Sequence, residues 1–310
     1  MLRLLVISAF TWWLVSGAYA QAGLRSEVAL VDVPHELATR ASPTLVDRRG
    51  PTVMDFRTAG AFLLVRAAVD GVDGTYVLDS GAPGLILNRP VTDRDAAVEG
   101  EGLNGAVAFA PTSATSLTWG PVTQTDLTAY AVDLDYLTET LGERVDGMIG
   151  YDQLRAAPVT IDYREQTITH HVADDDAHRR EGVRLRMRLR GHVAALRGRV
   201  DGRRVHFALD TGAGVNVLDD DRLARLGDDA HERLDDMLLR GLDARSARVP
   251  RTRVHLTEIA DANWIGLPFA FADLSGFAKA GLRVDGVLGK EWLQRHVVTL
   301  DYDRGFVWVE

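Results

Sequence analysis

The chain has 310 residues, of which 46% are hydrophobic and 25% charged, a composition typical of globular proteins with one large or two modest cores. Its formal net charge of −9 makes nucleic acid and anionic membrane surfaces poor partners. The absence of cysteine excludes disulfides, thiolate metal sites and a cysteine nucleophile.

The first 22 residues have the layout of a secretory signal peptide. Arg3 precedes an apolar run at 4–15, and small residues follow at Ala18 and Ala20. The run is shorter than the roughly 20 residues that span a bilayer. We therefore expect cleavage after Ala20 or Ala22, no membrane span in the mature chain, and a periplasmic or extracellular protein.

Three sequence blocks occur twice, in the same order. The copies of the first block are 131 residues apart and those of the other two are 139 apart, so one loop of the second copy is longer. Two tandem units of about 120 residues explain this pattern. The paired blocks are 69–82 and 200–213, 145–154 and 284–293, and 159–163 and 298–302.

Each unit is predicted to consist of β-strands. Apolar runs of four to eight residues alternate with Asp-Gly and Gly-rich turns. Only short helices are expected, at about 152–156, 219–226, 232–240 and 290–295. The predicted organisation is a signal peptide at 1–22, an N-terminal arm at 23–55, a first unit at 56–169, a charged linker at 170–182 and a second unit at 183–310.

The first repeated block contains an Asp-Ser/Thr-Gly tripeptide in both units. One such tripeptide is common as a turn after a strand. Here both copies follow an apolar strand and precede, about 70 residues later, an apolar pair and a glycine, which a simple turn does not require. The tripeptides are Asp79, Ser80 and Gly81 in the first unit and Asp210, Thr211 and Gly212 in the second.

These segments resemble the aspartic protease superfamily. "VLDSGA" and "ALDTGA" are similar to its two catalytic loops, and "GMIGYDQL" and "GVLGKEWL" to the segments that back them, with Ile149, Gly150, Leu288 and Gly289. The alanine after each glycine is more similar to retroviral-type proteases, whereas the fused duplicate resembles pepsins. The resemblance covers about 56–310 and implies an all-β, bilobal aspartic protease fold of two tandem retropepsin-like β-barrel units.

The chemistry of such a pair follows from the charges. Two carboxylates within hydrogen-bonding distance cannot both ionise, so Asp79 and Asp210 would share a proton. One then deprotonates a water while the other protonates the peptide carbonyl, without metal or cofactor, and we expect a bell-shaped pH dependence that favours acidic pH. Gly81 and Gly212 allow the sharp turns. The resemblance implies that Ser80 and Thr211 hydrogen-bond across the two units.

A mobile flap is expected in the first unit at Gly100 to Phe109. Its glycines, Gly100, Gly102 and Gly105, happen to spell a dinucleotide-binding fingerprint, but no βαβ context surrounds them. An ordinary surface loop is the alternative. No glycine-rich counterpart occurs in the second unit, where 232–240 is interpreted as helical.

The linker histidines do not indicate a metal site. His170, His171 and His178 lie near three aspartates at 174–176, but without regular spacing or a periodic scaffold. We interpret them as part of a solvated linker and expect no metal.

The sequence thus predicts an exported aspartic endopeptidase, monomeric, with a peptide or protein substrate between its units. Alternatives are a catalytically silent envelope protein that binds peptides in a protease-like cleft, and a structural β-protein. Residues 21–57 hold five arginines and five acids. A segment that blocks an acidic cleft should be basic, so we favour a structural arm over a removable pro-segment.

Overall fold

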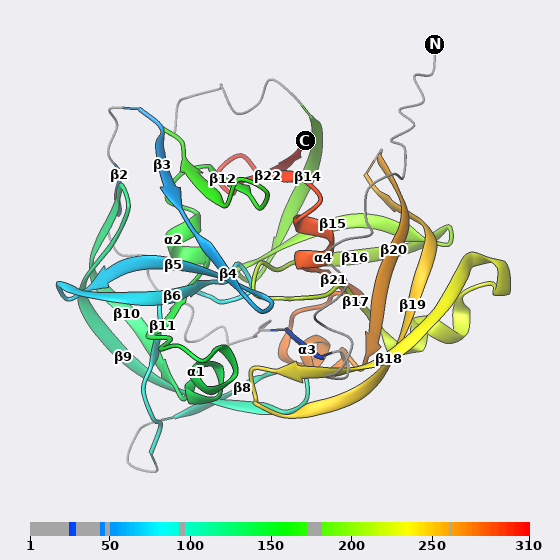
Figure 1. Ribbon diagram of the computed structural model, residues 1–310, viewed down its shortest axis with the longest axis horizontal. Coiled ribbons are helices and arrows are strands. Elements are labelled where there is room, and N and C mark those ends of the chain that lie inside the picture. Colours follow the sequence, from blue (N-terminus) through cyan, green and yellow to red (C-terminus); the bar gives the residue numbers. More distant parts are fainter. Residues whose placement is uncertain (1–24, 29–43, 47–49, 93–96, 173–181, 261) are drawn as a thin grey trace.

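The computed structural model describes residues 25–28, 44–46, 50–92, 97–172, 182–260 and 262–310. The expected signal peptide, most of the arm and most of the linker therefore lie outside the described residues. The described part is mostly β and has two lobes, as the sequence predicts (Figure 1).

The first lobe is a β-barrel built on a nine-stranded sheet. Pairing of β5 with β9 and of β9 with β10 closes the sheet on itself. Its elements are β4 (Arg57–Ala59), β5 (Phe62–Val69), β6 (Val72–Leu78), β7 (Ile86–Asn88), β8 (Val98–Glu101), β9 (Ala106–Trp119), β10 (Val122–Val132), α1 (Asp135–Leu141), β11 (Gly147–Ile149), α2 (Tyr151–Leu154), β12 (Val159–Asp162) and β13 (Thr167–His170).

The second lobe repeats this order, and pairing of β15 with β19 closes its barrel as β5 and β9 close the first. Its elements are β14 (Val183–Arg190), β15 (Val193–Val200), β16 (Arg203–Leu209), β17 (Val217–Asp219), the 3₁₀ helices η3 (Asp220–Arg225) and η4 (Asp228–Ala230), β18 (His231–Gly241), β19 (Ser246–Ile259), β20 (Ala262–Ala272), α3 (Ser275–Ala280), β21 (Gly286–Leu288), α4 (Lys290–Leu293), β22 (Val297–Asp301) and β23 (Phe306–Val309).

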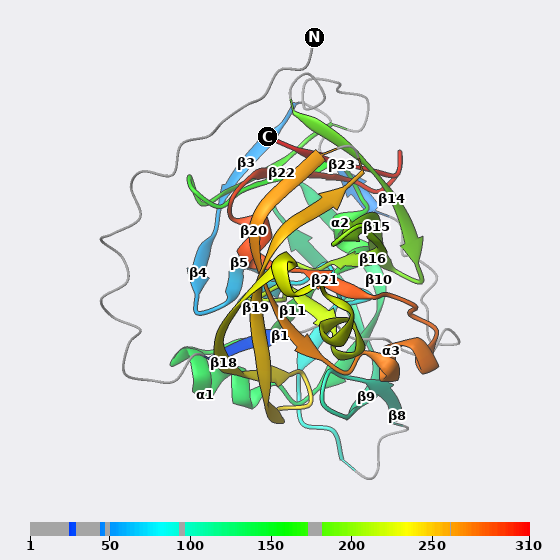
Figure 2. The same cartoon turned by 90° about the vertical axis from the view of Figure 1, so that its right-hand side faces the viewer.

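A continuous sheet joins the lobes. Its order is β14-β23-β22-β12-β13-β3, so the last two strands of each lobe lie next to each other. β12 and β22 pair antiparallel with Thr160 opposite Thr299, and the two hydroxyl oxygens are 2.6 Å apart. These threonines occupy the same position of the third repeated block, so an approximate twofold axis passes between them. Figure 2 shows β14, β22 and β23 together at the top, away from α1 and α3.

Three short N-terminal strands join this framework. β3 (Thr52–Asp55) extends the interlobe sheet beside β13, and β2 (Thr44–Val46) pairs with β10. β1 (Arg25–Val28) pairs in parallel with Leu238–Gly241 of β18. Each described piece of the N-terminal segment is therefore bound to a lobe by backbone hydrogen bonds.

The structure corrects the helix expected at 232–240, because these residues lie in β18. Leu234 and Met237 are spaced as on a helix face, but a β-bulge between them adds a residue to the strand and shifts its alternation. α1 and α3 were not expected, whereas the other three short helices occur within a few residues of their predicted positions. In the described part of the chain no helix is long and apolar enough to cross a membrane.

The structure also corrects the interpretation of His170 as a solvated linker residue. His170 ends β13, is 1% exposed, and packs edge-on against Trp119 with ring centroids 4.4 Å apart. His178 and the aspartates at 174–176 lie outside the described residues.

Candidate active site

Each Asp-Ser/Thr-Gly loop begins where a central strand ends. β6 pairs in parallel with β11, and the Asp79 amide donates to the Ile149 carbonyl at 2.9 Å. In the second lobe β16 pairs with β21, and the Asp210 amide donates to the Leu288 carbonyl at 3.0 Å. The apolar residues of the second repeated block therefore fix the start of both loops.

The glycines that follow these apolar residues are required by a close approach. A Cβ on Gly150 would lie 2.5 Å from the Ala82 carbonyl oxygen, and one on Gly289 would lie 2.4 Å from that of Val215. Real Cβ atoms essentially never come so close to backbone oxygens. Any larger residue would displace a loop.

Four reciprocal hydrogen bonds join the two loops across the lobes. The Ser80 amide donates to Thr211 Oγ1 at 2.9 Å, and the Thr211 amide donates to Ser80 Oγ at 3.0 Å. Each hydroxyl in turn donates to the opposite strand, Ser80 to the Leu209 carbonyl and Thr211 to the Leu78 carbonyl. Both side chains are buried, so water does not compete for these bonds.

The Asp79 and Asp210 carboxyl groups meet over the two glycines. Oδ1 of each aspartate accepts from the amide of the glycine two residues later, at 2.8 Å in both lobes. A Cβ on Gly81 would lie 3.0 Å from Asp210 Cγ, and one on Gly212 would lie 2.6 Å from Asp79 Cγ. Each loop thus approaches the opposite carboxyl so closely that only glycine fits.

Both carboxyl groups are fully buried, and this sets their protonation. Burial raises the pKa of Asp79 well above its usual range, and the negative charge of Asp210 raises it further. Burial also raises the pKa of Asp210 to about 6, although backbone amides at Gly212 and Gly81 oppose the shift. The two groups interact, so the pair holds a proton at neutral pH and titrates as one unit. Oδ2 of each aspartate has no hydrogen-bond partner among the described residues.

Several side chains around the loops were not singled out from the sequence. His192, in the turn between β14 and β15, has Nε2 2.9 Å from the Gly81 carbonyl oxygen. The matching turn of the first lobe is also contacted, because its Gly60 carbonyl accepts from Lys290 Nζ of α4 at 2.9 Å. The phenols of Tyr163 and Tyr302 are fully buried, and burial and the nearby aspartates raise their pKa values. The Asp-Tyr pair that the third block repeats, at 162–163 and 301–302, could have indicated these two tyrosines from the sequence.

The expected flap is an antiparallel hairpin of β8 and β9, with Gly100 paired to Val107. Gly102 and Gly105 form its turn, where the Gly102 amide donates to the Gly105 carbonyl at 2.9 Å. The matching hairpin of the second lobe is β18 and β19, which was missed because β18 was expected to be helical. The second lobe therefore has a flap-like hairpin too.

The two hairpins contact each other at their tips, through Asn104 of the first and Asp243 of the second. The Asn104 amide donates to Asp243 Oδ2 at 2.7 Å, and Asn104 Nδ2 donates to the Arg245 carbonyl at 3.0 Å. Leu103 is 7% exposed and belongs to an apolar cluster of the second lobe that includes Met237. In this structure the hairpins are closed on one another.

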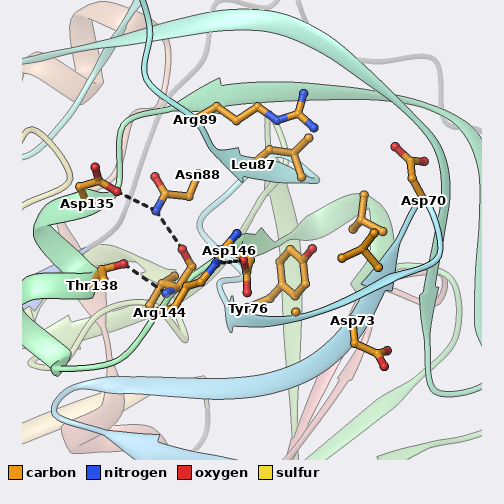
Figure 3. Close-up of a pocket in the computed structure, with 14 residues that line it drawn as sticks. Asp70, Asp73, Tyr76, Leu87, Asn88, Arg89, Asp135, Thr138, Arg144 and Asp146 are labelled. Atoms are coloured by element: carbon orange, nitrogen blue, oxygen red, sulfur yellow. Dashed lines mark hydrogen bonds and ion pairs between the residues drawn. The ribbon is translucent and has the colours of Figure 1, made fainter.

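One cavity of the described residues lies away from the aspartates. It has a volume of about 560 Å³ and lies on the first lobe around Tyr76 and Asp146 (Figure 3). The described residues also contain no group of three His, Asp or Glu side chains placed to hold a metal ion.

Comparison with known proteins gives a family match in the second lobe. Residues 196–292 match the family model described as Aspartyl protease, a stretch that contains Asp210, Thr211 and Gly212. A search of curated protein sequences found no match. Among solved structures the chain is similar to basic 7S globulin from soybean, with 11% identity, a TM-score of 0.48, and coverage of 84% of this chain and 94% of that chain.

The fold and the paired loops define a bilobal, mostly β protein in which two matching Asp-Ser/Thr-Gly loops meet between the lobes. The resemblance drawn from the sequence is confirmed by the family match, which covers most of the second lobe. The match is thus confined to residues 196–292 of the second lobe, and the first lobe repeats the strand order of the second.

Proposed function

We propose that the protein is an exported aspartic endopeptidase with Asp79 and Asp210 as its catalytic pair. The observation that carries this proposal is the pair of buried carboxyl groups, supplied by matching loops of two lobes and joined by reciprocal Ser80 and Thr211 hydrogen bonds. A structural β-protein has no need for two buried acids, because burying an unpaired carboxylate opposes folding.

The reaction needs one ionised and one protonated carboxyl. A water between the two groups gives a proton to the ionised aspartate as its oxygen attacks the peptide carbonyl carbon, while the protonated aspartate donates to the carbonyl oxygen. The aspartate that took the water's proton then donates it to the leaving nitrogen, and the other aspartate takes a proton from a gem-diol hydroxyl as the C–N bond breaks, which restores the shared proton of the pair. Oδ2 of each aspartate, unpaired among the described residues, is available for these transfers.

The substrate is proposed to be an extended peptide held between the lobes under the two hairpins. Extended peptides gain affinity by adding a strand to a free sheet edge. The β18 edge at Leu238–Gly241 already accepts a strand of this kind, Arg25–Val28 of the same chain. This pairing supports recognition of peptide backbone at the second hairpin.

One observation favours a second candidate, a silent peptide-binding protein with a protease-like fold. Both aspartates are fully buried and the hairpin tips are bonded to each other, so a substrate must first separate the hairpins. Both candidates bind a peptide in the cleft between the lobes, but only the peptidase hydrolyses it.

Peptide hydrolysis by variants of the pair separates the candidates. Asp79→Asn and Asp210→Asn keep the side-chain shape but remove proton transfer, so each should abolish turnover, and the double variant should be no worse than either one. Asp229→Asn, an exposed aspartate on η4, is the matched control and should retain full activity. A statine-type inhibitor should block the unmodified protein. No hydrolysis by the unmodified protein, with peptide binding retained, would establish the silent alternative.

Export is a separate part of the proposal, based on the signal-like sequence of residues 1–22. Mass spectrometry of the protein expressed with its full sequence in a bacterium should find a mature N-terminus at Gln21 or Gly23, outside the cytoplasm. A cytoplasmic protein that starts at Met1 would contradict export and leave the catalytic proposal intact.

A further inference from the structure

The 560 Å³ cavity of the first lobe has a counterpart at the matching position of the second lobe. The counterpart is bounded by Val200, Val205 and Leu218, which match Val69, Gly74 and Leu87 of the first lobe. Its free volume is only about 10 Å³. The duplicate thus has the same walls but almost no empty space.

The second-lobe cavity is filled by η3, the short helix that follows β17. Arg222 forms an ion pair with Asp285 and donates through Nη1 to the Arg204 carbonyl at 3.0 Å. Leu226 lines the same site, and Leu223 packs against the adjoining core cluster. An arginine and a leucine of one segment therefore occupy the site.

The groups that hold Arg222 are also present in the first lobe. Asp146 matches Asp285, and each aspartate accepts through Oδ2 from the backbone amide of the facing strand, at 2.9 Å from Thr75 and 2.8 Å from His206. Oδ1 of Asp146 points toward the cavity, where it bonds Arg144, whose side chain is 85% exposed (Figure 3). An exposed ion pair of this kind is worth about 1 kcal/mol or less, so a better-buried cation could displace it.

The rim of the first-lobe cavity is more acidic than that of its counterpart. The exposed residues Arg203 and Arg204 of the second lobe correspond to Val72 and Asp73. Four aspartates and two arginines line the first-lobe cavity, with Asp70 and Asp73 on one side and Asp135 on the other (Figure 3). This charge attracts a cation and steers it toward the site.

We propose that this cavity is an exosite for a peptide segment of another molecule that carries an arginine followed by apolar residues. The guanidinium binds Asp146 as Arg222 binds Asp285, and the apolar side chains contact Leu87 and Val69. β6 leads from the cavity, which Gly74 and Tyr76 line, toward Asp79, three residues or roughly 10 Å beyond Tyr76, so the exosite is separate from the paired carboxyl groups. The exosite proposal does not depend on whether the protein hydrolyses peptides.

The probe is the second-lobe segment itself, the acetylated and amidated peptide DRLARL of residues 221–226 with a fluorescent label. Its fluorescence anisotropy is titrated with the full chain carrying Asp210→Asn, so that hydrolysis does not consume it. Asp146→Asn should weaken binding about tenfold, because it removes a charge-assisted hydrogen bond. Arg144→Ala should strengthen binding about threefold by removing the competing guanidinium. Asp229→Asn should leave it unchanged.

Two further controls separate the cavity from effects on folding and on ligand type. Asp73→Arg changes an exposed residue and restores the rim charge of the second lobe, so it should weaken binding without lowering the melting temperature. Citrulline in place of the first arginine of the peptide should abolish binding, whereas citrulline in place of the second should not. N-acetylarginine amide should compete only at a concentration at least about tenfold higher.

Three results would overturn the proposal. Equal affinity for the unmodified, Asp146→Asn and Asp73→Arg chains would place the peptide elsewhere. Equal competition by N-acetylarginine amide would make the cavity a small-cation site. Binding that appears only after Arg94→Ala would show that an arginine of the chain's own segment 93–96, outside the described residues, occupies the cavity.

Discussion

The two catalytic aspartates proposed here have the same sequence environment as many Asp-Gly turns, and burial gives them their distinct chemistry. Each accepts a backbone amide through Oδ1, and each has a raised pKa because its charge is removed from water. His170 is the opposite case, a base whose burial disfavours its charged form. Burial therefore raises the pKa of the two acids and lowers the pKa of the histidine, and the pH predictions for the two cases differ accordingly.

The proposed reaction should have a pH window set by the coupled pair. Below a pH of about 6 the second carboxyl is protonated and the base is lost, so the rate should fall as the pH drops through that value. The alkaline limit lies higher, because the pKa of the other member is raised further. Burial therefore moves the expected optimum above the acidic range that the sequence alone suggests. A kcat/KM that still increases as the pH is lowered below 5 would contradict this assignment.

His170 should make the protein less stable in acid. Burial, with a smaller contribution from His171, lowers the pKa of His170 to about 4. An unfolded histidine takes up a proton near pH 6.5. The contribution of neutral His170 to the free energy of unfolding is therefore fully present above that pH and is lost as the pH falls to about 4, by roughly 3 kcal/mol in all. His170→Gln should flatten this part of the pH dependence of urea unfolding. His255→Gln, at an exposed position of β19, is the control and should leave the slope as it is.

At the scale of elements, the two hairpins control access to the carboxyl groups. Their tips are joined by side-chain to backbone bonds of Asn104 and by insertion of Leu103 into the apolar cluster of the other lobe. Opening should therefore be limited by these two residues.

Asn104→Ala should loosen the closed hairpins. It removes the two bonds donated by Nδ2, each worth about 1 kcal/mol, so amide hydrogen exchange in 98–107 should accelerate about thirtyfold. Leu103→Ala should have the larger effect, because it withdraws apolar surface from the second lobe. Glu99→Ala, exposed on the same hairpin, is the control. Unchanged exchange in both tip variants would show that the hairpins are held by other contacts.

At the scale of the molecule, the lobes are joined at the interlobe sheet and at the reciprocal bonds between Ser80 and Thr211. Because one chain supplies both loops, a monomer is expected to be sufficient. A protein that is active only as a dimer in size-exclusion measurements would contradict this expectation.

Thr211→Ala should weaken the joining of the lobes. It removes the acceptor of the buried Ser80 amide and the donor to the Leu78 carbonyl, which should destabilise the protein by about 2–4 kcal/mol. Thr211→Ser keeps the hydroxyl and should retain most of the stability and activity, as Ser80 does in the other lobe. Equal melting temperatures for the two variants would mean that these bonds do not contribute to stability.

The sequence by itself determined the duplication, the β class and the four segments that form the site. Local patterns encode these features, because an apolar strand followed by Asp-Ser/Thr-Gly specifies a strand and a turn wherever it occurs. The repeat then implies that the two loops are equivalent. It also places Thr160 and Thr299 at matching positions, although nothing local indicates that they face each other across the interlobe sheet.

Only the tertiary structure decided what depends on contacts between distant residues. The bulge in β18 disguised a strand as a helix, so the second hairpin and its contact with Asn104 were missed. His170 lies in a charged stretch, yet pairing of β13 with β12 and β3 buries it beside Trp119. The first-lobe cavity exists because a segment like η3 does not fill it among the described residues. The burial of a side chain and the presence of a cavity depend on how distant segments pack, and local strand and turn patterns do not encode them directly.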